Sequence, residues 1–161
     1  MSSFDAFDRI DCQIVALLQK NARLSNKEIA AAVGLAPSSS WERVKRLSDL
    51  GVFTGFHARV RPKALGIGLQ AMVAVRLGRH SHDLVEKFRG EVLGLPEVIA
   101  VYHLAGRDDF LVHVVVRDAE HLREFALSRL TTRHEVAHLE THLVFEYTRK
   151  EALPDYLTPD E

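Results

Sequence analysis

Hydrophobic residues recur every three or four positions in three segments of the first fifty residues, the spacing of one face of an α-helix. The first segment follows Asp8, whose carboxylate can cap a helix that fades near Lys20. The second begins at Ser25, which forms a capping box with the Glu three residues later, and stops at Gly34, a typical helix-ending residue. The third begins at Pro37, because proline suits the first turn of a helix, and continues to the next glycine.

A short helix, a turn with glycine and a longer helix, in this order, form the helix-turn-helix pattern of DNA-binding proteins. Small Ala30 and Ala31 let two helices cross closely, and the polar side of the third helix would then face the major groove. Serine hydroxyls can bond phosphates or bases, and arginine can bind guanine through two hydrogen bonds. The candidate DNA-binding residues are Ser38, Ser39, Ser40 and Arg43 for bases or nearby phosphates, and Lys45 and Arg46 for phosphates.

Several residues of the third helix also have a structural interpretation. Polar residues on a helix face are commonly just solvated, and Arg46 could pair with Glu42 four positions earlier. Trp41 is expected in the hydrophobic core rather than as a wedge in DNA, because it shares a face with Val44. Ala36 stands where a capping side chain would stabilise the helix by about 1 kcal/mol, unless one of the following serines caps instead.

Residues 51–60 alternate between apolar and polar side chains and stop at Pro62, which predicts a strand that leaves the helical segment. Residues 63–66 are expected to form a linker. The domain boundaries expected from these patterns are a helix-turn-helix domain with its hinge strand at residues 1–62, a second domain at residues 63–150 and a C-terminal tail at residues 151–161.

The second half of the chain predicts strand, helix, strand, strand, helix, strand. The expected strands are residues 71–77, 98–104, 110–116 and 136–147, and the expected helices are residues 83–93 and 118–130. This βαββαβ order is typical of a ferredoxin-like fold, in which both helices cover one face of an antiparallel sheet. The fold class is therefore α+β, a winged-type helix-turn-helix followed by a ferredoxin-like domain.

Both faces of the predicted sheet carry apolar residues. On the strand at residues 110–116, Phe110 and Val112 point to one face, whereas Leu111 and Val115 point to the other. The helices can cover one face only, and a soluble monomer rarely leaves a large apolar patch in water. We therefore expect a symmetric dimer, which would also present two recognition helices to two half-sites.

Composition agrees with a globular, two-part protein. The 161 residues are 47% hydrophobic and 27% charged, and no apolar stretch approaches the length of a membrane span. The start of the chain lacks the features of a secretory signal, and the single cysteine, Cys12, fits a reducing compartment, so a cytoplasmic protein is expected. Residues 1–62 contain nine Lys/Arg and six Asp/Glu, a balance of +3, whereas residues 63–161 have a balance of −4. The basic N-terminal part fits a DNA-binding role, although the excess is small.

Other chemistry is less well supported by the sequence. His138, Glu140 and His142 point to one face of the last strand and could hold zinc or another divalent ion, although the sequence favours a polar strand face or a subunit rim. Asp108 and Asp109 are neighbours whose side chains point apart, which favours a turn or the binding of an amine over acid–base catalysis. Neither a phosphate-binding loop nor a catalytic triad stands out, so no enzyme activity and no cofactor are expected.

The chain resembles the leucine-responsive regulatory protein/AsnC (Lrp/AsnC) family of transcriptional regulators. The resemblance covers nearly everything from Phe7 to Lys150, and only the motifs together make it specific. They are Asp8-Arg9-Ile10-Asp11, Arg23-Leu24-Ser25-Asn26 with Glu28, Val33-Gly34-Leu35-Ala36-Pro37, Glu42-Arg43-Val44-Lys45-Arg46-Leu47, Gly51-Val52-Phe53-Thr54-Gly55-Phe56 and His103-Leu104-Ala105-Gly106-Arg107-Asp108-Asp109-Phe110.

The resemblance implies a regulator that binds double-stranded DNA, forms dimers that assemble into octamers or other higher oligomers, and carries a ligand-binding RAM domain. It implies an amino acid or related metabolite as effector, bound between dimers beside the turn at residues 106–110. Asp109 would receive the α-amino group, as a carboxylate at a turn can; a turn cap or a subunit salt bridge is the alternative. The candidate effector-binding residues are Tyr102, Leu104, Gly106, Asp108, Asp109 and Thr141.

The sequence also departs from the family pattern, and two other functions remain open. Ala36 replaces the usual serine before the proline, and residues 138–140 replace a polar run that often precedes the threonine. A siroheme-decarboxylase-like enzyme subunit has a similar size and fold, but tends to carry a His-Asn-Tyr-Arg-like run where this chain has Val101-Tyr102-His103-Leu104. A metal-responsive regulator is the third possibility.

Overall fold

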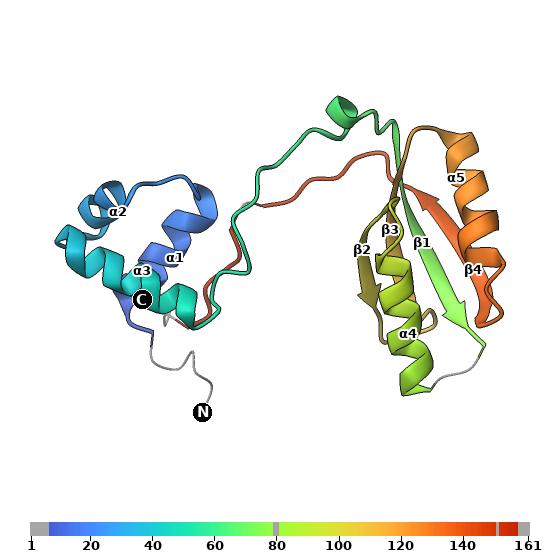
Figure 1. Ribbon diagram of the computed structural model, residues 1–161, viewed down its shortest axis with the longest axis horizontal. Coiled ribbons are helices and arrows are strands. Elements are labelled where there is room, and N and C mark those ends of the chain that lie inside the picture. Colours follow the sequence, from blue (N-terminus) through green and yellow to red (C-terminus); the bar gives the residue numbers. More distant parts are fainter. Residues whose placement is uncertain (1–6, 79–80, 151, 158–161) are drawn as a thin grey trace. The chain divides into compact units, whose positions relative to one another are not determined.

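The chain folds into two compact units (Figure 1). The computed structural model describes residues 7–78, 81–150 and 152–157. The helical unit contains the chain up to Ala58 together with the C-terminal residues from Thr148, and the sheet unit contains Arg59–Tyr147.

Three helices form the helical unit: α1 (Arg9–Lys20), α2 (Asn26–Val33) and α3 (Pro37–Asp49). Their ends confirm the predicted start and stop signals. Asp8 and Ser25 each cap their helix through a capping box, and Gly34 ends α2 in the left-handed conformation with φ of 71°. The buried residues at the centre of the three helices are Ile14, Leu18, Ile29 and Leu47.

The strand predicted at residues 51–60 is wrong. Within the described part of the chain, these residues are extended but pair with no strand, and the following Pro62–Leu65 form a single 3₁₀ turn, η1. A strand needs a neighbour to accept its backbone hydrogen bonds, and alternation in sequence says nothing about whether such a neighbour exists.

The sheet unit has the predicted βαββαβ order. Its strands are β1 (Leu69–Leu77), β2 (Val98–His103), β3 (Phe110–Val116) and β4 (Val136–Leu143), arranged in the order β2-β3-β1-β4 with every neighbouring pair antiparallel. The helices are α4 (His82–Leu93) and α5 (Ala119–Phe125), the latter continued by a π-helical segment, η2 (Ala126–Thr131). The last strand ends at Leu143 rather than at residue 147, because pairing with β1 stops at Ala71.

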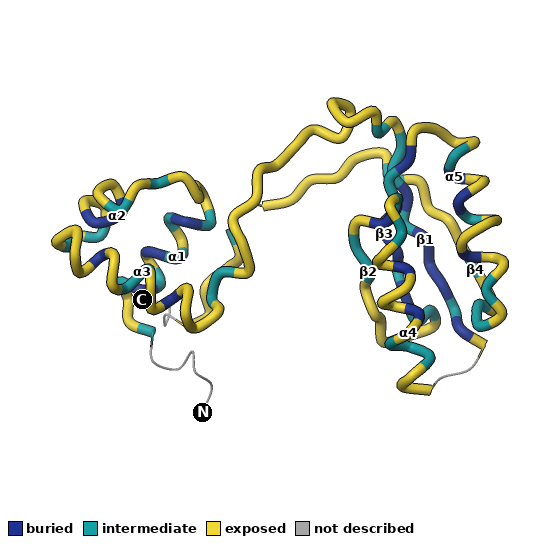
Figure 2. Tube along the Cα trace, viewed as in Figure 1, coloured by how far each residue is buried: buried dark blue, intermediate teal, exposed yellow. Residues whose placement is uncertain are grey.

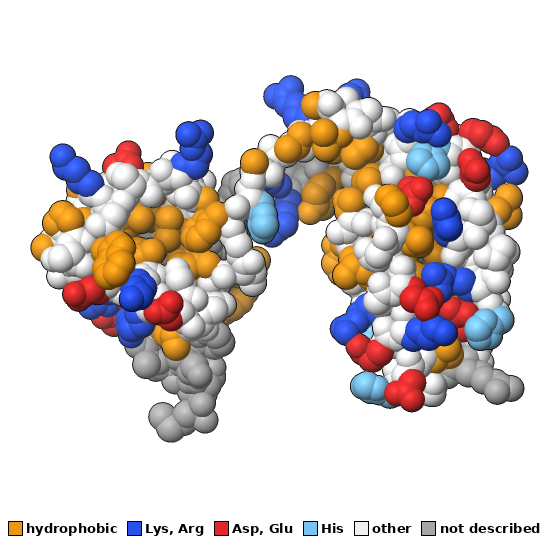
Figure 3. Space-filling view, in the orientation of Figure 1, with side chains coloured by type: hydrophobic (Ala, Val, Ile, Leu, Met, Phe, Trp, Pro, Cys, Tyr) orange, Lys and Arg blue, Asp and Glu red, His pale blue; other side chains and the backbone are white. Residues whose placement is uncertain are grey.

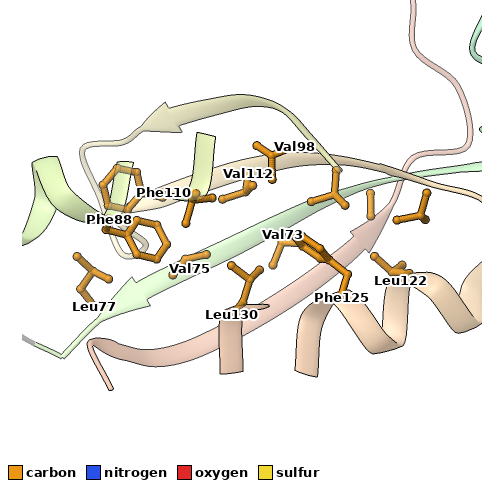
Figure 4. Close-up of a cluster of buried hydrophobic side chains, with 14 residues drawn as sticks. Val73, Val75, Leu77, Phe88, Val98, Phe110, Val112, Leu122, Phe125 and Leu130 are labelled. Atoms are coloured by element: carbon orange, nitrogen blue, oxygen red, sulfur yellow. The ribbon is translucent and has the colours of Figure 1, made fainter. Parts of the chain in front are cut away.

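Both helices pack on the same face of the sheet. Alternate residues of β1 and β3, such as Val73 and Val112, point to the helices and are completely buried (Figure 4). They meet Phe88 of α4, Phe125 of α5 and Leu130 of η2 in one continuous core. This single-sided core is the arrangement that the hydrophobic pattern predicts.

The opposite face of the sheet carries no helix among the described residues. Its central strands contribute Met72 and Ala74 from β1 and Leu111 and Val115 from β3, which face away from the helical side. A dimer that covers this face remains a prediction from the sequence.

Candidate functional site

The outer side of α3 is a continuous exposed stripe. Val44 and Leu47 pack against the unit's core, so residues on the opposite side of the helix reach solvent (Figure 2). The exposed polar residues of this stripe are Ser38, Ser39, Glu42, Lys45, Arg46, Ser48 and Asp49. Of the predicted DNA-binding residues, Ser38, Ser39, Lys45 and Arg46 therefore lie on the accessible side.

Ser40 does not belong to this stripe, although it was predicted to contact DNA. Its side chain is completely buried, and its hydroxyl makes no hydrogen bond. Ser40 lies four residues before Val44 and seven before Leu47, which is the spacing of the core-facing side of the helix. A buried hydroxyl cannot reach a duplex, so Ser40 is withdrawn from the candidate DNA contacts.

Trp41 also differs from its prediction, because it is more exposed than expected. It was expected in the core, but 55% of its surface is exposed. The Nζ atom of Lys45 lies 5.3 Å from the centre of its ring, a cation–π contact one turn further along the helix. The core-facing line of α3 runs through Ser40, Val44 and Leu47, and Trp41 falls beside this line instead of on it.

The two arginines of α3 are held by carboxylates of α1. Arg43 Nη1 lies 2.7 Å from Asp8 Oδ2 and 2.9 Å from Asp11 Oδ1, and Arg46 Nη2 lies 2.5 Å from Asp11 Oδ2. The Asp11 side chain is completely buried, whereas 29% of the Arg43 side chain and 44% of the Arg46 side chain remain exposed. Arg46 thus pairs with α1 instead of with Glu42, and a shallow depression lined by Asp8, Asp11, Ser39, Glu42, Arg43 and Arg46 marks the place.

This cluster, Asp8, Asp11, Arg43 and Arg46, combines helix capping with ion pairing. The backbone N–H of Asp11, followed by the Arg43 guanidinium, holds the pKa of Asp8 below its ordinary value. The hydrogen bonds that the Arg43 guanidinium donates to Asp8 and then to Asp11 raise the pKa of Arg43. The ion pairs of both arginines tie α3 to the start of α1, which favours a positioning role for Arg43 over direct base contact.

The start of α3 lacks a side-chain cap, as Ala36 predicts, and neither Ser38 nor Ser39 supplies one. Asn26 of α2 donates instead to the backbone carbonyl of Pro37, with Nδ2 and O 2.7 Å apart. This bond joins the starts of the two helices, so the recognition helix is fixed at its beginning by α2 and along its length by α1.

The candidate effector site in the sheet unit is the turn between β2 and β3. Gly106 has φ of 148°, which only glycine adopts easily, so the residue is required by the turn. The backbone of Asp109 is hydrogen-bonded on both sides, to Val75 O at 2.9 Å and to Leu104 N at 2.8 Å. Its carboxylate oxygen Oδ2 accepts a hydrogen bond from the backbone N–H of Leu77 at 2.7 Å. The Asp109 carboxylate thus joins the turn to the end of β1.

The turn brings most of the predicted effector residues together. Tyr102 and Leu104 are exposed at the end of β2 beside Asp108 and Asp109. Thr141 does not join them, because it pairs with Val73 on the far side of β1, about 13 Å along the strand from the level of Leu77 where Asp109 binds. One protomer therefore holds two separate parts of the predicted site.

Arg76 also lies at this site, although it is not among the residues predicted from the sequence. Its Nη2 lies 3.5 Å from Asp108 Oδ1, a weak pair, and its Nε is buried without a hydrogen-bond partner. Arg76 thus places a cation with spare donors next to the candidate turn. Its position one residue before the end of β1 was visible in the sequence, but its neighbourhood depends on strand pairing.

The described residues do not bring His138, Glu140 and His142 together as a metal site. Although the three residues alternate along β4, no group of three or more His, Cys, Asp or Glu side chains in the described ranges could hold a metal ion. Alternating side chains on one strand point the same way without converging, and no neighbouring strand supplies the missing ligand. His142 Nε2 instead lies 3.8 Å from Glu140 Oε1.

A membrane-spanning role is not indicated for the described part of the chain, since none of its helices is both long and apolar enough to cross a bilayer.

The visible face of the helical unit shows hydrophobic side chains beside basic and acidic ones (Figure 3).

Two family models match the chain. Residues 7–48 match the AsnC-type helix-turn-helix domain, and residues 70–153 match the Lrp/AsnC ligand binding domain. The first match contains α1, α2 and most of α3, and the second contains the four-stranded sheet except for Leu69, the first residue of β1.

Individual proteins match over both units. The transcriptional regulator AldR of Mycolicibacterium smegmatis is 42% identical over 142 residues, which span 88% of this chain and 83% of that protein. The leucine-responsive regulatory protein of Haemophilus influenzae is 32% identical over 90% of this chain and 87% of that protein. A crystal structure of a Neisseria meningitidis transcriptional regulator in complex with L-methionine superposes with a TM-score of 0.85 and 31% identity, covering 92% of this chain and 97% of that one.

Proposed function

The chain belongs to the Lrp/AsnC family of transcriptional regulators, and from this premise we propose which of its surfaces bind DNA, effector and a second copy. It is a DNA-binding transcriptional regulator with an effector-binding domain. The observation that carries the proposal is the exposed polar side of α3 within the helix-turn-helix match. We place DNA binding in residues 1–62, effector binding in residues 63–150 and a tail in residues 151–161.

The DNA-facing surface in this proposal is the outer side of α3. Ser38 and Ser39 would bond phosphates or base edges, and Lys45 would neutralise a phosphate. Arg46 donates from Nη2 to Asp11, and the other N–H groups of its half-exposed guanidinium would donate to DNA. Arg43 would act mainly through its ion pairs, which set the angle of the helix.

The effector-facing surface is the turn at residues 104–110. We propose that it binds an amino acid or a related small metabolite, because it combines Asp108, Asp109 and Arg76, the charges that complement a zwitterion. The complex of the Neisseria regulator with L-methionine supports this ligand class. Because Thr141 lies apart within one protomer, its part in the site would require a second copy.

We further propose a homodimer, built on the helix-free sheet face, that assembles into octamers or other higher oligomers. The apolar centre of that face supports the dimer. A regulator must reach chromosomal DNA, so the proposed location is the cytoplasm. The relatives are regulators, not enzymes, so we propose that the chain has no catalytic activity and needs no cofactor.

The test is fluorescence anisotropy with a labelled duplex from the region upstream of the chain's own gene. We expect tight binding that survives excess unrelated DNA and weakens steeply with salt, because phosphate contacts release counterions. A thermal-shift screen with the standard amino acids should identify at least one that raises the melting temperature and alters the DNA affinity. Equal affinity for unrelated DNA, or turnover of a tetrapyrrole by the purified protein, would overturn the proposal.

A further inference from the structure

Trp41 is the one large aromatic side chain on the outer half of α3, and it is the only tryptophan in the chain. An indole ring gains more than almost any other side chain from burial, yet 55% of Trp41 faces solvent. The helix has a well-packed core side without it, formed with Val44 and Leu47. The folding of the helical unit therefore does not account for the exposed ring.

The surroundings of Trp41 are those of the proposed DNA surface. Ser38 lies one turn before it on the helix, and Lys45 lies one turn after it with its ammonium group 5.3 Å from the ring centre. The contact with Lys45 keeps a positive charge beside the ring. Lysine is depleted from the centres of protein–protein interfaces, so this pairing fits a polyanion better than another protein surface.

The base edges in the major groove present mainly hydrogen-bond donors and acceptors. The C5-methyl group of thymine is the apolar group among them, so it is the base-edge partner that an apolar side chain can contact there. We propose that Trp41 is a specificity-determining residue that packs on a thymine methyl group while Lys45 binds the neighbouring phosphate. This inference rests on the proposed function, because it requires α3 to enter the major groove.

The first experiment uses Trp41 as its own reporter. A duplex is selected by the wild-type chain from a randomised pool, and tryptophan emission is followed as this duplex is added to the full-length protein. Burial against bases should quench the emission and shift it to shorter wavelength at saturation. An unchanged spectrum at saturating duplex would overturn the inference, while failure to select any duplex would instead overturn the proposed function.

The second experiment identifies the partner group. The selected duplex is compared with the same duplex in which thymine is replaced by uracil, which removes the methyl groups and keeps the hydrogen-bonding edges. Each contacted methyl is worth about 0.8 kcal/mol of burial, so the wild-type affinity should fall about fourfold per methyl. Trp41→Ala should bind the thymine duplex roughly tenfold or more weakly and should not distinguish thymine from uracil.

The matched control is Tyr156→Ala, which removes an aromatic side chain that is 89% exposed and lies outside α3. It should keep both the affinity and the preference for thymine. Circular dichroism and gel filtration establish that each variant is folded and has the wild-type oligomeric state. An equal loss on uracil substitution in the wild type and in Trp41→Ala would show that the methyl is read by another residue and would reject the inference.

Discussion

Replacement of Asp11 by alanine should destabilise the helical unit far more than loss of an exposed charge. The buried carboxylate accepts hydrogen bonds from Arg43 Nη1 at 2.9 Å, from Arg46 Nη2 at 2.5 Å and from the backbone N–H of Asp8 at 3.2 Å. Its removal leaves both guanidinium groups without their shared partner and opens one half of the capping box of α1.

The magnitude follows from the exposure of each partner. A hydrogen bond to a charged group contributes roughly 1.5–3 kcal/mol when it is buried. The arginines are 29% and 44% exposed, so water screens the pairs and compensates part of the loss. Half of a capping box adds somewhat under 1 kcal/mol. We therefore expect Asp11→Ala to lower the free energy of unfolding by about 2–3 kcal/mol.

The assay is urea denaturation followed by tryptophan fluorescence, which reports on the helical unit because Trp41 lies on α3. Asp49→Ala, which removes an exposed acid from the same helix, is the matched control and should change the free energy by less than about 0.5 kcal/mol. If Asp11→Ala behaved like this control, the ion pairs would not hold α3, and Arg43 would regain its place as a direct DNA contact.

Three further predictions concern charge and ligand binding. Arg43→Ala should weaken DNA binding without changing the slope of log Kd against log salt concentration, because Arg43 is held by ion pairs within the protein. Lys45→Ala should lower that slope by about 0.9, the value for one phosphate contact. If Arg43→Ala lowered the slope by the same amount, Arg43 would be a phosphate contact. Burial lowers the pKa of His113, so the unfolded chain binds a proton on this residue more readily than the folded chain does. The free energy of unfolding should therefore have its full value above pH ~6.5 and should fall as the pH drops towards the folded-state pKa. Urea midpoints across this range should fall less steeply for His113→Gln, and parallel curves would exclude His113 as the cause. Arg76→Met should reduce the thermal shift produced by the effector amino acid, with Arg129→Met on η2 as the control, and an undiminished shift would remove Arg76 from the site.

Features that depend on near neighbours in the chain were predictable from the sequence. The capping boxes of α1 and α2 join residues three positions apart, and the left-handed Gly34 follows from the end of its own helix. The βαββαβ order likewise follows from local hydrophobic periodicity. These elements form wherever their own sequence favours them, so the pattern alone identifies them.

Features that depend on distant residues were not predictable in the same way. Asp11 meets Arg43 across 32 positions, so the charge on α3 that suggested DNA contact has an intramolecular partner that periodicity does not reveal. Residues 51–60 have the alternation of a strand and lack the neighbour. The positions of Ser40 and Trp41 can be predicted from the sequence when Val44 and Leu47 are considered together. The side of α3 that contains both of these core residues also contains Ser40, whereas Trp41 lies beside it.

The C-terminal residues return to the helical unit, where the backbone N–H of Leu153 donates to Gln19 Oε1 at 2.7 Å. These partners are 134 positions apart, so the ribosome releases the first of them long before it makes the second. The three helices are therefore synthesised before the sheet, and the segment at Leu153 that contacts α1 is synthesised after it. A fragment that stops at Ala58 would hence keep the DNA-reading helices and lack the closing segment of its own unit.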